Sequence, residues 1–84
     1  MTRTIDWSKQ AVTDLLDLPD WRIAQAVDAA VKLFALTGVG TIVTFPSLDG
    51  PDEVRLYAGP HARYYAVVRY SKAVVYVERV LRSP

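Results

Sequence analysis

Hydrophobic and polar residues alternate along TRTIDW, residues 2–7. A period of two is typical of a strand with one buried face. The spacing then becomes helical, and Ser8 offers a side-chain cap for a first helix over residues 9–18. Pro19 ends this helix, because its ring cannot continue one.

A second helical stripe lies between Asp20 and Gly38. Asp20 can cap its start, and Gly38 stands where left-handed backbone geometry favours glycine. The apolar positions of this stripe are Ile23, Val27, Ala30, Val31 and Phe34. We therefore expect a helical hairpin of unequal arms over residues 8–37.

The rest of the chain predicts strands. TIVTF (41–45) is β-branched, PSLDGPD (46–52) is typical of a turn, and two further strands joined by a hairpin follow. The expected order is β-α-α-β-β-β. This is an α+β fold, in which two helices pack on one face of a small twisted antiparallel sheet of three or four strands, within a single domain over residues 1–84.

Two turns set the expected register. A turn at Ser71-Lys72 pairs Tyr70 with Ala73, and a loop at residues 59–61 (Gly-Pro-His) pairs Ala58 with Ala62. Because paired residues point to the same side, both turns predict one apolar face for the helices to cover. That face contains Val54, Leu56, Ala58, Tyr64, Ala66, Val68, Tyr70, Ala73, Val75 and Val77.

The opposite face is rich in arginine and tyrosine. It is expected to carry Glu53, Arg55, Tyr57, Arg63, Tyr65, Val67, Arg69, Val74, Tyr76, Glu78, Val80 and Arg82. Guanidinium forks bind phosphates and tyrosine rings stack on bases, so the pattern indicates a nucleic-acid surface. The alternative is a solvent-tolerant sheet face on which long side chains cover the backbone and pair with Glu53 and Glu78.

Composition narrows the function classes. The 84 residues include no cysteine, which excludes disulfides, thiolate metal sites and a cysteine nucleophile, and suits a reducing compartment such as the cytoplasm. No apolar run resembles a signal peptide or a membrane span, so no membrane partner is expected. The net charge is only +1, and binding to nucleic acid would therefore depend on arginines concentrated on one face.

Two segments carry a family likeness that extends over nearly the whole chain. IDWSKQAVTDLLDL (5–18) and VRLYAGPHARYYAVVRYSKAVVYVERVLR (54–82) resemble the RelE/ParE superfamily of bacterial type II toxins. The most specific part is RYYAVVR followed by a valine-rich strand that ends in arginine. The resemblance implies a toxin whose partner is a small cognate antitoxin protein.

In the RelE branch, the resemblance implies a metal-independent endoribonuclease that needs no cofactor. It would inhibit translation and arrest growth by cutting mRNA on the ribosome, through attack of a 2′-hydroxyl on the adjacent phosphate. Arg55, Arg63 and Arg82 match the family's catalytic arginines. The remaining arginine and tyrosines of the polar face are expected to bind RNA, namely Tyr57, Tyr65, Arg69 and Tyr76.

The chain departs from the RelE pattern at two places. No tyrosine follows Arg82, and the turn over residues 46–52 is acidic where the family is often rich in lysine. Tyr65 or Tyr76 can replace the missing tyrosine, and His61 can act as a base. The alternatives are that His61 is merely exposed in a loop and that Glu78 pairs with Arg63 or Arg82.

Two other functions fit the same resemblance. A ParE-like chain poisons DNA gyrase and carries no fixed catalytic set. A degenerate toxin is no enzyme and only binds its antitoxin.

Overall fold

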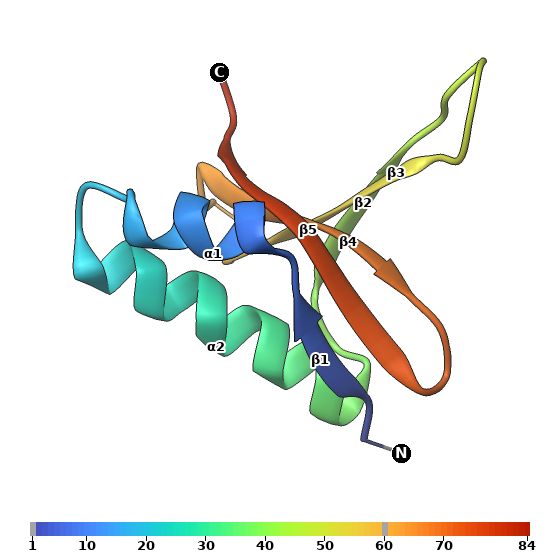
Figure 1. Ribbon diagram of the computed structural model, residues 1–84, viewed down its shortest axis with the longest axis horizontal. Coiled ribbons are helices and arrows are strands. Elements are labelled where there is room, and N and C mark those ends of the chain that lie inside the picture. The colour runs from blue at the N-terminus through green and yellow to red at the C-terminus, as the bar shows by residue number, and fades with distance from the viewer. Residues whose placement is uncertain (1, 60) are drawn as a thin grey trace.

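The computed structural model describes residues 2–59 and 61–84. Its elements are β1 (Thr4–Trp7), α1 (Lys9–Leu16), α2 (Trp21–Thr37), β2 (Thr41–Phe45), β3 (Glu53–Tyr57), β4 (Tyr64–Tyr70) and β5 (Val74–Arg82). The strands form one open sheet in the order β1-β5-β4-β3-β2. Both helices lie on one side of this strongly twisted sheet (Figure 1), so the fold belongs to the α+β class.

Three of the four predicted helix ends are confirmed, whereas α1 ends at Leu16, two residues before its predicted end. The Ser8 hydroxyl accepts a hydrogen bond of 2.9 Å from the N–H of Ala11, and the Asp20 carboxylate accepts one of 2.9 Å from the N–H of Arg22. Gly38 ends α2 with φ of 76°, a left-handed conformation that side chains disfavour. Short-range capping chemistry therefore fixed both helices close to their predicted bounds.

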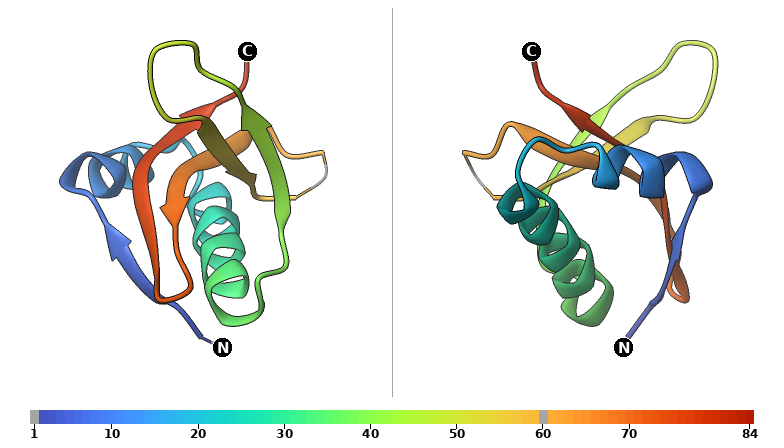
Figure 2. Two further views of the ribbon diagram at one scale, coloured as in Figure 1. Left: turned by 90° about the vertical axis from the view of Figure 1, so that its right-hand side faces the viewer. Right: turned by 60° about the vertical axis from the view of Figure 1, so that its left-hand side comes forward.

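The core fills the space between the helices and the sheet. It consists of Ala11, Val27, Val31, Phe34, Ala35, Leu56, Ala66, Val68, Val75, Val77 and Val80. The predicted apolar face is thus the buried one, and Val68 and Val75 are almost inaccessible to solvent. The opposite side carries no helix in either view of Figure 2, and we call it the uncovered face.

A close approach at Gly40 joins α2 to the sheet. A Cβ atom on Gly40 would lie only 2.6 Å from Cδ1 of Leu56 and 3.5 Å from Cδ1 of Phe34. A side chain at position 40 would therefore have to displace Leu56, whereas its distance from Phe34 would be an ordinary van der Waals contact.

Two features of the sheet differ from the prediction. The sheet has five strands, because β3 is a strand of its own that the predicted element order did not count. It is also mixed rather than antiparallel, since β1 pairs parallel with β5 from Thr4↔Val74 to Trp7↔Val77. Alternation along residues 2–7 reports a half-buried strand, but it contains no information about the neighbouring strand or its direction.

Both predicted turns are too short. Tyr70 pairs with Val75 rather than Ala73, and the β3–β4 register pairs Tyr57 with Tyr65. The Ser71 hydroxyl accepts hydrogen bonds from the N–H groups of Ala73 and Val74, which holds the wider β4–β5 turn. Each register moves by an even number of residues, so the predicted division into faces survives. Pro60 of the predicted β3–β4 loop lies outside the described residues.

A β-bulge overturns the prediction for the last residues. Val68 pairs with Val77 but Val67 pairs with Arg79, which leaves Glu78 as an extra residue in β5. The bulge exchanges the two faces beyond Glu78. Val80, predicted on the polar face, is only 3% exposed in the core. Arg82, predicted on the same polar face, instead pairs with Tyr64 on the side of the helices.

Candidate functional site

The centre of the uncovered face is an arginine held between two rings. The guanidinium carbon of Arg55 lies 4.0 Å from the ring centroid of Phe45 and 4.6 Å from that of Tyr65. Its Nε donates a hydrogen bond of 2.6 Å to Oε2 of Glu53. Hydrogen bonds to Glu53 and to Tyr57 raise the pKa of Arg55. The site therefore contains a permanent cation with a fixed plane.

Tyr57 lies beside this cation. Its hydroxyl is 3.4 Å from Oγ of Ser83, and its ring centroid is 5.2 Å from that of Tyr65. The hydrogen bond with Ser83, and after it a hydrogen bond with Arg55, lowers the pKa of Tyr57. Tyr57 is thus a better proton donor than an ordinary phenol and a candidate general acid.

The two tyrosines considered as replacements for the missing terminal tyrosine occupy other environments. Tyr65 is only 5% exposed under Arg55, although no helix covers this face. Tyr76 is half-exposed and pairs with Arg69 towards the opposite end of β4. Arg69 is four positions after Tyr65 along the strand, a distance of about 13 Å. Of the predicted RNA-binding residues, only Tyr57 and Tyr65 therefore lie next to Arg55.

The structure does not bring the three predicted catalytic arginines together on one face. Arg55 is on the uncovered face, Arg82 is on the helix side, and Arg63 lies in the segment just before β4. The N–H of Ser83 donates a hydrogen bond of 2.6 Å to the carbonyl of Arg63. The last residues of the chain therefore link Tyr57 to Arg63.

Carboxylates pair with two arginines of the uncovered face. Glu53 pairs with Arg55, and Glu78 pairs with Arg69 rather than with Arg63 or Arg82 as predicted. Glu78 follows Tyr76, the register partner of Arg69, by two residues, so it lies on the same face and diagonally across from Arg69. The predicted alternative of an arginine face neutralised by its own glutamates is thus present at these two positions.

The sequence pattern placed Tyr57 among the RNA-binding residues, but it gave no sign of the contact with Ser83 or of Tyr57 as a proton donor. The alternation along β3 places Tyr57 on the same side as Arg55, and this part of the site was foreseeable. The Ser83 contact depends on the bulge in β5, for which the sequence has no short-range signal. His61 is exposed in the β3–β4 connection.

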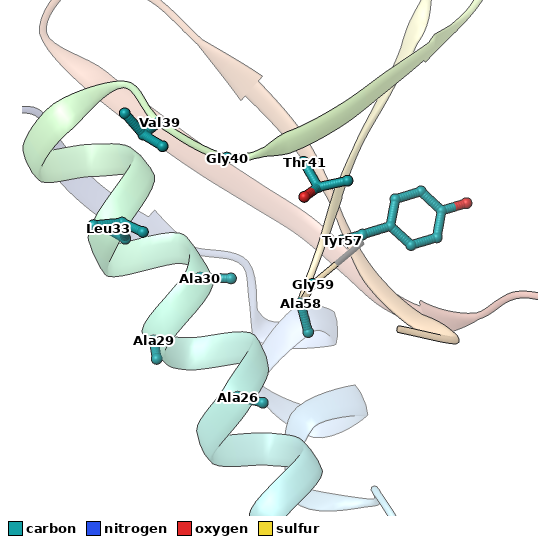
Figure 3. Close-up of a pocket in the computed structure, with 10 residues that line it drawn as sticks. All are labelled: Ala26, Ala29, Ala30, Leu33, Val39, Gly40, Thr41, Tyr57, Ala58 and Gly59. Atoms are coloured by element: carbon teal, nitrogen blue, oxygen red, sulfur yellow. The ribbon is translucent and has the colours of Figure 1, made fainter. Parts of the chain in front are cut away.

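An apolar groove lies on the other side of Tyr57. It has a volume of about 570 Å³ and runs between α2 and the strands β2 and β3 (Figure 3). Ala26, Ala29, Ala30 and Leu33 line it on α2, while the phenol of Tyr57 points away from the helix. The groove therefore has an apolar lining, and the polar chemistry of this region belongs to the uncovered face.

The described residues contain neither a cluster of metal-binding side chains nor a helix that could span a membrane. Within residues 2–59 and 61–84, no three acidic, histidine or cysteine side chains are grouped so that they could hold a metal ion. Neither of the helices in that part of the chain is long and apolar enough to cross a membrane.

Comparisons of the chain with protein-family models, with curated proteins and with solved structures give no match. The function must therefore be inferred from the site itself.

Proposed function

We propose that this chain is a toxin of the RelE/ParE type that cleaves mRNA on the ribosome. The observation that supports the proposal most directly is the contact between Arg55, fixed between two rings, and Tyr57, whose pKa is lowered. A fixed cation beside an acidified phenol matches the needs of RNA cleavage, which develops negative charge on a phosphate and on a leaving oxygen.

In the proposed reaction, the 2′-oxygen of a ribose bonds to the adjacent phosphorus, and the bond from phosphorus to the 5′-oxygen of the next nucleotide breaks. Arg55 stabilises the charge on the phosphate oxygens, and Arg63 and Arg82 bind phosphates further along the strand, where it passes the end of the sheet. Tyr57 gives its proton to the leaving 5′-oxygen. Glu53, whose side chain is 40% exposed and paired with Arg55, accepts the proton of the 2′-hydroxyl.

The test is primer extension on mRNA after induction of the chain in growing bacteria, beside a DNA supercoiling assay. Cuts in phase with codons, lost in Tyr57→Phe, are the expected result. Tyr76→Phe is the matched control, because it removes the hydroxyl of a tyrosine far from Arg55 on the same face. Trapped gyrase–DNA complexes without mRNA cuts would favour the gyrase poison and reject the ribonuclease.

The ion pairs of Arg55 and Arg69 favour a second candidate, a binding module without catalysis. In this case the uncovered face would only receive a segment of the cognate antitoxin. Normal growth and intact mRNA after induction, together with co-purification of a small partner protein, would support this candidate. The toxin proposal includes the same partner, so mRNA cleavage is the deciding result.

A further inference from the structure

The first turn of α2 presents an exposed aromatic side chain. Trp21 is 69% exposed, whereas Trp7 packs against the core. The guanidinium carbon of Arg22 lies 5.7 Å from the centroid of the Trp21 ring. An exposed indole with an adjacent cation can stack on another flat ring.

Arg22 also lines a hollow between α2 and the start of β4. The hollow has a volume of about 360 Å³, and Figure 2 shows the segment that enters β4 beside the first turn of α2. The other lining residues are Ile23, Ala26, Ala62, Arg63 and Tyr64. The surface is thus apolar in its middle and includes arginines from both elements.

The charge of this surface is not cancelled by ion pairing. Arg82 adjoins the hollow through its register partner Tyr64. In the part of the chain that the structure describes, Arg22, Arg63 and Arg82 form no ion pair, in contrast to Arg55 and Arg69 on the uncovered face. Asp20, the carboxylate next to Trp21 in the chain, caps α2 through the N–H of Arg22. A polyanion is therefore the complementary ligand.

We propose that Trp21 and Arg22 bind a nucleotide of single-stranded RNA that flanks the reacting phosphate. The inference rests on the proposed ribonuclease function. It follows from a chain of neighbours: the Tyr57 hydroxyl lies 3.4 Å from Oγ of Ser83, the Ser83 N–H donates to the carbonyl of Arg63 at 2.6 Å, and Arg63 lines the same hollow as Arg22. An RNA strand that leaves Tyr57 in this direction reaches Arg63 first, then Arg22 across the hollow and the Trp21 ring beside Arg22.

The combination of side chains favours RNA over an acidic peptide. Arginine forks bind phosphates and carboxylates alike. The exposed indole of Trp21 adds a flat partner for a base, and a peptide of acidic residues would leave this ring unused.

The first test is the affinity of the full chain for a fluorescein-labelled 2′-O-methyl oligonucleotide, measured by anisotropy. This probe lacks the attacking hydroxyl and is not cut. Trp21→Ala should weaken binding by about 5- to 100-fold, because it removes a stacked base, while Trp21→Phe should keep most of the affinity. Arg22→Ala should reduce the slope of log affinity against log salt by about 0.7.

Two variants on α1 serve as matched controls. Leu16→Ala removes a side chain that is 78% exposed, and Lys9→Ala removes one exposed charge. Both should bind the probe like the wild type. Thermal unfolding of every variant checks that the fold is intact.

The second test separates this inference from the proposed function. In a ribosome-dependent cleavage assay, Trp21→Ala should raise KM and leave kcat near the wild-type value, since it loses uniform binding. If Tyr57→Phe abolishes cleavage but Trp21→Ala changes neither KM nor probe affinity, the inference is wrong and the proposed function stands. If the wild type neither cuts nor binds RNA, both fail. Trp21-dependent binding of polyglutamate in place of RNA would also overturn the inference.

Discussion

The carboxylate of Asp14 in α1 accepts a hydrogen bond of 3.0 Å from the backbone N–H of Val80 in β5. The β1 ladder ends at Trp7↔Val77, so the edge of β5 beyond this pair has no neighbouring strand. The Ser8 hydroxyl donates to the carbonyl of Glu78 at 2.7 Å, and the Asp14 carboxylate also pairs with Arg79 at 2.7 Å. Side chains of Ser8 and of α1 thus form the hydrogen bonds that a neighbouring strand would otherwise make with the backbone of β5, and they hold the bulge in place.

We expect Asp14→Asn to lower the free energy of unfolding by about 1 to 2 kcal/mol at neutral pH, since hydrogen bonds to a charged group are lost or weakened. The corresponding change in Tm is about 4 to 8 °C per kcal/mol for a chain of this size. Differential scanning calorimetry measures the change. Asp28→Asn is the control, because its pair with Lys32 is a solvent-exposed helix pair and should contribute less than about 0.5 kcal/mol.

The stabilisation by Asp14 should depend on pH. Burial alone would raise the pKa of Asp14, but hydrogen bonds from Arg79, Gln10 and the Val80 N–H outweigh it and hold the pKa below its ordinary value. The contribution is therefore fully present above the unfolded pKa of about 3.9 and is lost as the pH falls through the lower folded pKa. Urea unfolding of the wild type should show that the free energy of unfolding decreases at acidic pH. A wild-type curve with the same pH dependence as Asp14→Asn would contradict it.

The bulge can be tested by comparing two neighbouring residues. Val80 is buried in the core and Leu81 is on the other side of the sheet. Val80→Asn should therefore cost more than about 2 kcal/mol, since it buries an unpaired amide, and Leu81→Asn should cost less. A regular β5 without the bulge would reverse this order in a thermal unfolding experiment.

A methyl group at position 40 should be poorly tolerated. Because a Cβ there would lie 2.6 Å from Cδ1 of Leu56, we expect Gly40→Ala to cost about 1 to 3 kcal/mol. Gly50→Ala meets no atom within 4 Å and should change stability little. In a double-mutant cycle by urea unfolding, Gly40→Ala should cost less in a Leu56→Ala background. Additive losses would exclude the proposed clash.

The proposed acid should leave a signature in the pH profile of cleavage. Tyr57 must be protonated to act, so kcat should fall as the pH rises through the pKa of Tyr57. The hydrogen bond with Ser83 is the main cause that lowers this pKa. Ser83→Ala should move this alkaline limb to higher pH, and Tyr57→Phe should reduce kcat by about a hundredfold or more. An unchanged limb in Ser83→Ala would exclude Tyr57 as the acid.

The helices and the buried face were predictable because they depend on short-range chemistry. A cap such as Ser8 acts within one turn, and alternation along a strand decides which side is apolar. The wrong turn lengths did not change which residues were predicted to be buried, since a shift of two residues leaves Val68 and Val75 on the same side.

The parallel pairing of β1 and the bulge at Glu78 were not predictable, because both depend on contacts between distant segments. Asp14 and Val80 are 66 residues apart in the chain, and neither residue type indicates the other. The candidate site was affected in the same way. The shared face of Arg55 and Tyr57 could be predicted from the alternation along a single strand. The position of Arg82 and the contact of Ser83 with Tyr57 could not, because they depend on the bulge in β5.

The place of β5 between β1 and β4 has a consequence for synthesis of the chain. The pair Thr4↔Val74 joins segments separated by most of the sequence, and such non-local pairing slows folding. While the chain is still emerging from the ribosome, β1 has no neighbouring strand, and Asp14 of α1 has no backbone group of β5 to bind. We therefore expect the native sheet to close only after β5 has been released, so that a prematurely terminated product does not fold.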